Sequence, residues 1–248
     1  MARTELTKLA KELRRRVELS SESDWLAAGS RPAATTAPIP PAKNKEEGSR
    51  TERLAALSKK IHACRLCSLG ASRLNAVPGV GSAEARVMFI GEGPGFDEDH
   101  KGEPFIGRSG QLLDKIMESI GLSRQTVYIA NTVKCHPMKD PSNPEARGND
   151  RPPTPEEMAA CRPFLDEQIN IIEPKIIVTL GASALKAMLG DGPPITKVRG
   201  QWREYRPAGG AAVKLLPTFH PAALLRDPNL KKDVWTDMKN LKKELESE

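Results

Sequence analysis

The chain has 248 residues, 38% of them hydrophobic, and a formal net charge of +6. This length allows one sizeable core plus an appendage, and no apolar run reaches the length of a membrane span or of a signal-peptide core. We therefore expect no membrane partner and a cytoplasmic location, associated with the nucleoid if the source is bacterial. The positive charge favours a polyanionic partner such as nucleic acid, although a basic protein without such a partner has the same composition.

Residues 1–50 are expected to form a helical appendage followed by a flexible linker. Leucine and alanine recur at loosely helical spacing over 4–28, and 29–50 is rich in Pro, Ala and charged residues with little to bury. A solvated tail explains this stretch more simply than a dedicated DNA-binding arm does.

A compact domain is expected over 51–248. Short apolar runs predict strands, and apolar residues at helical spacing predict helices between them. At Thr154, a capping-box pattern followed by proline marks a helix start. The predicted strands are 86–91, 126–131, 175–179 and 213–219, the predicted helices are 51–63, 109–121, 154–172, 181–189 and 229–246, and 195–206 is an irregular hairpin or strand. This alternation predicts a three-layer α/β/α fold with a central, mostly parallel four-stranded sheet.

Polar and aromatic residues follow all four predicted strands. Glu92 and Phe105 lie in the Gly-rich loop after the first strand, and Asn131 ends the second. Ser183 follows the third strand and His220 follows the fourth. Each has a simpler individual explanation, as a core ring, a turn cap or a surface histidine. Because the carboxyl ends of parallel strands open onto one crevice, their joint placement favours a ligand site.

These side chains suit a flat, hydrogen-bonding ligand. An aromatic ring stacks on a heterocycle, and an asparagine amide pairs with an adjacent carbonyl and N–H, the edge that uracil presents. An imidazole can donate to a second carbonyl oxygen and stabilise charge that develops there. A carboxylate can hold a water molecule. Together these groups can break an N-glycosidic bond.

Five segments, in order within about 60–245, resemble the iron-sulfur uracil-DNA glycosylases, family 4 of that superfamily. They read GEGPG at 91–95, GEPFIGRSGQLL at 102–113, YIANTVKCHP at 128–137, TLGASA at 179–184 and FHPAALLR at 219–226. The resemblance implies a monofunctional, monomeric enzyme that hydrolyses the glycosidic bond of uracil in single- or double-stranded DNA, leaves an abasic site and so initiates base excision repair. The loop over 136–153 is longer than the family's usual form.

The resemblance also implies roles for individual residues. Catalysis falls to Glu92 and Glu98, near the water, and to His220, at the departing uracil. Base binding falls to Gly93, Gly95, Phe105 and Asn131. DNA contacts fall to Ser183, Leu224, Leu225 and Arg226, with a leucine filling the space that the flipped base leaves. Independently of the resemblance, Lys197 and Arg199 are candidate phosphate contacts, and a plain solvated turn explains them equally well. For Leu224 and Leu225, a hydrophobic turn packed on the last helix is the simpler alternative.

Four cysteines, Cys64, Cys67, Cys135 and Cys161, form the candidate metal site. A C-x2-C pair with two distant cysteines suits tetrahedral zinc or a [4Fe-4S] cluster, and buried thiols are a third explanation. The resemblance implies a structural [4Fe-4S] cluster held by all four. A non-enzymatic nucleic-acid-binding module that kept the fold and the metal site is the alternative function, but the presence of Glu92, Asn131 and His220 argues against it.

Overall fold

The computed structural model describes residues 48–247, so nearly all of the predicted appendage lies outside the described residues. Among the helices that are described, none is both long and apolar enough to span a bilayer. The first helix, α2 (Arg50–Ala63), begins with a capping box between Ser49 and Glu52. It corresponds to the helix predicted over 51–63.

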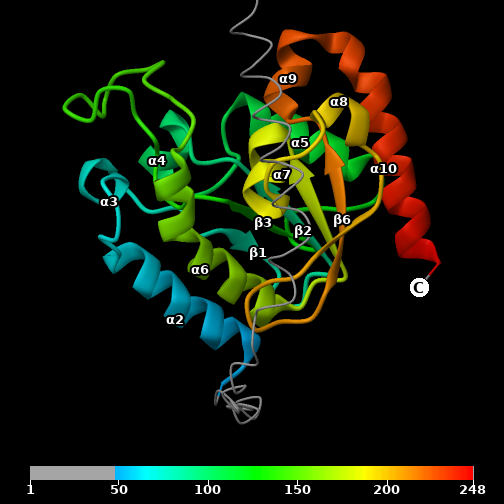
Figure 1. Cartoon of the computed structure of the whole chain (residues 1–248), viewed down its shortest axis with the longest axis horizontal. Helices are drawn as coiled ribbons and strands as arrows, with labels where there is room; N and C mark the ends of the chain where they lie inside the picture. The colour runs from blue at the N-terminus through cyan, green and yellow to red at the C-terminus, as the bar shows by residue number, and fades with distance from the viewer. Residues whose placement is uncertain (1–47, 248) are drawn as a thin grey trace, which may run out of the picture. The chain divides into compact units, whose positions relative to one another are not determined.

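A six-stranded sheet forms the centre of the described chain, in the order β1-β3-β2-β4-β6-β5 (Figure 1). The four central strands are parallel: β3 (Tyr128–Asn131), β2 (Val87–Gly91), β4 (Ile176–Leu180) and β6 (Val213–Thr218). The α/β class and the parallel centre are therefore confirmed. Two short antiparallel edge strands raise the predicted count of four: β1 (Val80–Gly81) and β5 (Arg203–Tyr205). The strand β5 lies within 195–206, the stretch expected to form an irregular hairpin or strand, whereas β1, with two residues, is too short for a periodic signal.

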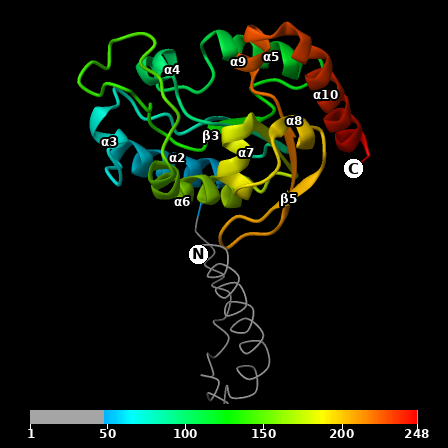
Figure 2. The ribbon, with the colours of Figure 1, turned by 45° about the horizontal axis from the view of Figure 1, so that its top comes forward.

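Successive residues of a strand point to opposite faces of the sheet, so alternate side chains are buried in two separate cores. Phe89 and Ile129 pack with α5 (Arg108–Glu118), α9 (Pro221–Arg226) and α10 (Lys231–Glu246). Met88 and Ile177 pack with helices on the other face, α6 (Pro155–Ile172) and α7 (Ala182–Leu189). Figures 1 and 2 show these two layers on either side of the sheet.

An additional helix lies outside the three layers. Leu57 and Ile61 of α2 are buried against α6, so α2 packs behind α6 and not on the sheet. The helix α6 begins as predicted, with Thr154 as N-cap, Pro155 at its start and Glu157 closing a capping box. The shorter helices α3 (Leu69–Ser72), α4 (Phe96–Lys101), α8 (Ile195–Val198) and η1 (Pro228–Leu230) were not predicted, since each has too few residues to repeat a helical pattern.

The parallel register brings the predicted loops to one edge of the sheet. Gly91 at the end of β2 lies opposite Asn131 at the end of β3. On the other side, Leu180 of β4 lies opposite Thr218 of β6. The segments that follow these strands therefore emerge side by side, which confirms the predicted convergence.

Candidate active site

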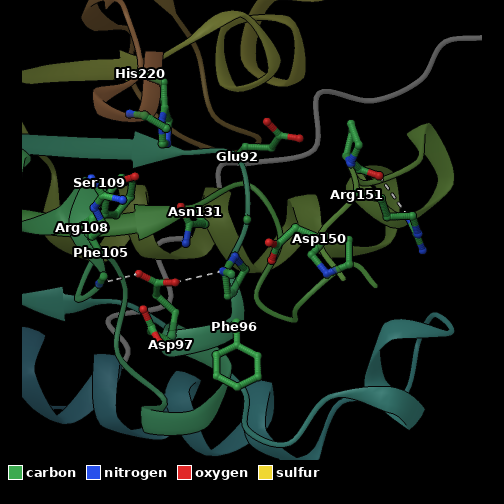
Figure 3. A pocket seen from close by; sticks show the side chains of 18 of the residues that line it. Glu92, Phe96, Asp97, Phe105, Arg108, Ser109, Asn131, Asp150, Arg151 and His220 are labelled. Atoms are coloured by element: carbon green, nitrogen blue, oxygen red, sulfur yellow. Dashed lines mark hydrogen bonds between the residues drawn. The ribbon is translucent and has the colours of Figure 1, made fainter. Parts of the chain in front are cut away.

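A cavity of about 560 Å³ lies at the carboxyl ends of the parallel strands. Its lining includes seven of the predicted residues: Glu92, Gly93, Gly95, Glu98, Phe105, Asn131 and His220. Figure 3 shows that Glu92, Phe105, Asn131 and His220 come from separate strand ends and loops around one hollow. Arg226, predicted to contact DNA, also lines it. The predicted DNA contacts that do not line the cavity are Ser183, Lys197, Arg199, Leu224 and Leu225.

The floor of the cavity depends on the absence of a side chain at Gly91. A Cβ there would lie 2.4 Å from Asn131 Oδ1 and 2.5 Å from Phe105 Cζ, closer than real contacts allow. The Phe105 ring is 5% exposed, and its backbone has a φ of 55°, a left-handed conformation that few non-glycine residues adopt. Arg124 donates to Pro104 O at 3.0 Å and also to Phe105 O, which holds this turn in place. The ring and the amide thus both lie against Gly91 of β2.

Asn131, which lines the cavity, has a buried side-chain acceptor without a partner. Its side chain is 2% exposed, and its Oδ1 is buried without a hydrogen-bond partner among the described residues. A buried carbonyl oxygen without a donor costs about 1–3 kcal/mol, so such a group is normally completed by a ligand or water. The side chain of Asn131 is therefore a candidate acceptor for an N–H group of a ligand.

His220 is a neutral hydrogen-bond donor in this environment. Burial lowers the pKa of His220 to about 4, and the positive charge of Arg226 adds to the shift. Its Nδ1 accepts a hydrogen bond from Ala222 N at 3.1 Å, so the single proton of the neutral ring resides on Nε2. The imidazole lies 5.6 Å from the Phe105 ring, centroid to centroid. A ligand stacked on Phe105 is therefore within reach of a neutral N–H donor.

The two predicted acidic residues have different surroundings. Glu98 accepts from three backbone N–H groups, those of Gly95, Ile106 and Gly107, at 3.0–3.1 Å. Its carboxylate thereby ties the two halves of the loop together. The Glu92 side chain is half-buried in the cavity and has no partner among the described residues. Only Glu92 keeps its oxygen lone pairs available for a water molecule.

The proline-rich loop over 136–153 forms one wall of the cavity, a role the sequence did not predict. Arg147 lies over the Phe96 ring at 4.4 Å and pairs with Asp97 at 3.3 Å. Asp150 accepts from the buried His136 at 2.8 Å, which lowers the pKa of Asp150. The unusual length of this loop was the only signal in the sequence, and it did not indicate where the loop folds.

Arginines lie around the opening of the cavity. Arg108 and Arg226 are exposed, and neither has an acidic partner among the residues that the structure describes. Next to Arg226, the predicted leucine pair divides: Leu224 is buried in the core at 2% exposure, whereas Leu225 is 42% exposed. Leu224 thus takes the alternative role of a packed turn residue, and Leu225 alone projects outward.

The remaining predicted DNA contacts lie outside the cavity. Arg199 is engaged within the protein, through bonds to Asp237 at 3.0 and 2.5 Å, a contact that favours a structural role. Lys197 is exposed on α8, and Ser183 is half-exposed in the first turn of α7.

The sequence comparisons agree with this geometry. Residues 78–239 match the family model of the uracil DNA glycosylase superfamily. The chain is 42% identical to the type-4 uracil-DNA glycosylase of Thermotoga maritima, over 81% of this chain and 98% of that protein. The chain belongs to the type-4 uracil-DNA glycosylases. The type-4 uracil-DNA glycosylase of Sulfurisphaera tokodaii is 42% identical, over 76% of this chain and 83% of that protein. The one of Archaeoglobus fulgidus is 39% identical, over 77% of this chain and 92% of that protein.

This type-4 chain gathers its four cysteines around one small cavity. Cys64 ends α2, Cys67 follows it, Cys135 lies after β3, and Cys161 belongs to α6. All four are free thiols, and burial raises the pKa of Cys135 to about 11. Over residues 48–247, no group of three or more His, Cys, Asp or Glu is arranged to hold a single metal ion.

Hydrogen-bond donors surround these sulfurs. Arg73 donates to Cys135 Sγ at 2.8 Å, and the backbone N–H of Lys134 donates to Cys161 Sγ at 3.3 Å. The fully buried Lys134 ammonium also donates to Asn131 O at 2.8 Å and to Gln168 Oε1 at 2.6 Å. Burial lowers the pKa of Lys134 to about 8, and the nearby Cys161 and Cys135 oppose that shift. Positive charge therefore lies between the cysteine cavity and the asparagine of the active site in this glycosylase.

Proposed function

We propose that the protein is a monofunctional uracil-DNA glycosylase, which hydrolyses the N-glycosidic bond of uracil in DNA and so initiates base excision repair. The observation that carries the proposal is the unpaired Asn131 Oδ1, buried beside an aromatic ring at the end of β3. An acceptor that lacks a donor suits the N3–H of uracil, and the Asn131 amide can donate to O4 at the same time. Cytosine has no proton on N3, so its N3 and Asn131 Oδ1 would face each other as two acceptors with no donor between them.

The base reaches this site by leaving the DNA stack. Phe105 supports one face of the flipped uracil, and Gly91 permits the ring and the amide to meet. Leu225 fills the space left in the duplex, and Arg226 and Arg108 bind phosphates beside it. Lys197 and Ser183 are further predicted contacts to the DNA backbone.

Bond cleavage needs a stabilised leaving group and a nucleophile. As the bond between C1′ and N1 breaks, its electrons remain on uracil, and His220 Nε2–H donates to the oxygen O2 where negative charge develops. Glu92 holds the water, whose oxygen bonds to C1′ and whose proton passes to solvent. Glu98 acts through the shape of the loop, because three backbone N–H groups occupy its carboxylate. The uracil anion takes a proton from solvent, and the products are an abasic site and free uracil.

The cysteine cavity fits a structural [4Fe-4S] cluster better than zinc. Four cysteines line it, and the cationic Arg73 and Lys134 lie beside the sulfurs, where they offset the negative charge of a cluster held by four thiolates. Cys64, Cys67, Cys135 and Cys161 would hold the cluster, which would supply cross-links between α2, α6 and the segment after β3. Iron without zinc in protein purified without air would support this assignment, and stoichiometric zinc would overturn it.

Excision of uracil from an oligonucleotide tests the function. Cluster-loaded protein should convert a uracil-containing strand into one that alkali cleaves at the uracil, in single-stranded or double-stranded DNA. Folded, iron-loaded protein that binds this DNA without forming abasic sites would be a nucleic-acid-binding module and not an enzyme. The same preparations show by sedimentation whether the protein is the expected monomer; nucleoid association in a cell is visible by microscopy.

A further inference from the structure

The C-terminal helix α10 gathers most of its lysines on one face. At 100° per residue, Lys231, Lys232, Trp235, Lys239, Lys242 and Lys243 fall within about 120° of the helix circumference. All six side chains are exposed. We call this surface the lysine face. The buried residues Val234, Met238 and Leu241 occupy a neighbouring side of the helix and pack on the sheet.

Three of the four acidic residues of α10 are held by cations from other elements. Asp237 and Asp233 pair with Arg199, at 2.5 and 3.5 Å, and Glu244 pairs with Lys214 of β6. They therefore do not neutralise the lysine face. Among the described residues, Lys231, Lys232, Lys239 and Lys243 have no acidic partner, whereas Lys242 pairs with Glu246 at 3.8 Å. The face is a strip of positive charge about 18 Å long, at 1.5 Å per residue.

An aromatic ring lies within this strip. Trp235 is 47% exposed, and Lys239 Nζ lies 5.9 Å from the ring centroid. An exposed tryptophan beside unpaired ammonium groups suits a partner with both negative charge and apolar surface, such as the phosphates and deoxyriboses of DNA.

The lysine face continues from the rim of the active site. Arg226 lines the cavity, and α10 begins five residues later, after the single turn of η1. In both Figure 1 and Figure 2, α10 starts beside α9 and runs away from it. DNA whose uracil occupies the cavity thus has one flank on the α9 side, where α10 starts.

We infer that the lysine face of α10 binds the backbone of double-stranded DNA on one flank of the flipped nucleotide. This inference rests on the proposed function for the position of the DNA, and it adds a contact outside the active-site loops. At 3.4 Å per base pair, the strip covers about five base pairs. Because phosphate contacts carry no sequence information, the face increases affinity without changing which base is excised.

The salt dependence of DNA binding measures these contacts. The probe is a duplex with a tetrahydrofuran abasic residue, bound by full-length, iron-loaded protein. Each lysine that no longer neutralises a phosphate should reduce the slope of log K against log salt by about 0.9. Combining Lys231→Gln, Lys232→Gln and Lys239→Gln should therefore lower the slope by roughly two to three and weaken binding roughly ten- to hundredfold at moderate salt. Trp235→Ala should weaken binding without changing the slope.

A matched control combines Lys59→Gln, Lys60→Gln and Lys175→Gln, which remove the same charge from α2 and from the segment before β4, and it should retain most of the slope. Shortening one flank of the duplex should abolish the difference between the α10 variant and wild type, and shortening the other should not. If the α10 variant has the same slope of log K against log salt as wild type, the inference is overturned. This outcome includes the case in which the lysine face binds a protein instead of DNA. At saturating protein, the α10 variant should release uracil at the wild-type rate. If wild-type protein releases no uracil, the proposed function is refuted, whereas the inference about the lysine face is still decided by the salt slope.

Discussion

The active-site cavity and the cysteine cavity lie at opposite ends of the segment from Asn131 to Cys135. They differ in whether their polar side chains have hydrogen-bond partners. In the active site, Asn131 Oδ1 and the Glu92 carboxylate lack partners among the described residues. Around the cysteines, Arg73 donates to Cys135 and to three backbone carbonyls, those of Ile61, His62 and Cys64. Unpaired groups indicate where a ligand binds and reacts, whereas paired groups indicate a region that maintains structure. Four substitutions or conditions test this contrast, in order of expected effect.

Removing the leaving-group donor should have the largest effect. His220→Ala should reduce the turnover of uracil excision roughly a hundredfold or more, because the variant has no donor to stabilise the charge that develops on O2 in the transition state. The affinity for abasic-analogue DNA should change much less. The exposed His62→Ala on α2 is the control. Equal reductions in affinity and turnover would show that His220 only helps to bind DNA.

Filling the floor of the active site should have the next largest effect. In Gly91→Ala, the new methyl group lies 2.4 Å from Asn131 Oδ1, so the amide or the Phe105 ring must move. A shift of this size should reduce single-turnover uracil excision about ten- to a hundredfold. Gly192→Ala is the matched control, because nothing lies within 4 Å of its Cβ position. Wild-type activity in Gly91→Ala would mean that ring and amide need not be in contact.

The paired region predicts a loss of stability instead. Lys134→Met keeps most of the side-chain volume but leaves Asn131 O and Gln168 Oε1 without their donor. The free energy of unfolding should fall by about 1–3 kcal/mol. Denaturant titration of the iron-loaded protein measures this, with the exposed Lys115→Met of α5 as control. A variant as stable as wild type would indicate that the buried charge costs as much as its hydrogen bonds contribute.

The smallest effect is the expected persistence of activity in mild acid. The neutral form of His220 is the donor, and its pKa in the folded protein is about 4, below the usual 6.5. As pH falls from 7 to 5, the ring stays neutral, so kcat/KM should change little from this group. The same shift affects folding stability, because the unfolded chain binds a proton on His220 more readily than the folded protein does. The contribution of His220 to the free energy of unfolding is therefore fully present above about pH 6.5 and decreases as the pH falls towards 4. A loss of activity centred near pH 6.5 would contradict the assigned environment.

The sequence predicted the elements that carry strong local signals. The apolar runs of β2 and β4 and the capping box at Thr154 each appear near the predicted position. The convergence of Asn131 and His220 followed from the parallel sheet. These features depend on a few neighbouring residues and on a general rule for strand ends.

The remaining features depend on tertiary contacts that no local pattern encodes. Nothing near Leu224 and Leu225 in the sequence distinguishes the buried leucine from the exposed one, because the difference arises from how α9 packs on α5. The pairing of Arg199 with Asp237 joins residues 38 positions apart. Asp150 reaches the cavity only because His136 and the backbone of Phe96 hold its loop against α4.

The most direct test of the account is the base preference of Asn131→Asp. With the carboxyl group in place of the amide, the edge no longer matches uracil alone, so the ratio of uracil to cytosine excision should fall relative to wild type. Excision from oligonucleotides with one uracil or one cytosine at the same position measures it, with Asn170→Asp, outside the cavity, as control. A variant that keeps full uracil activity and full rejection of cytosine would contradict the claim that the unpaired amide of Asn131 reads the base.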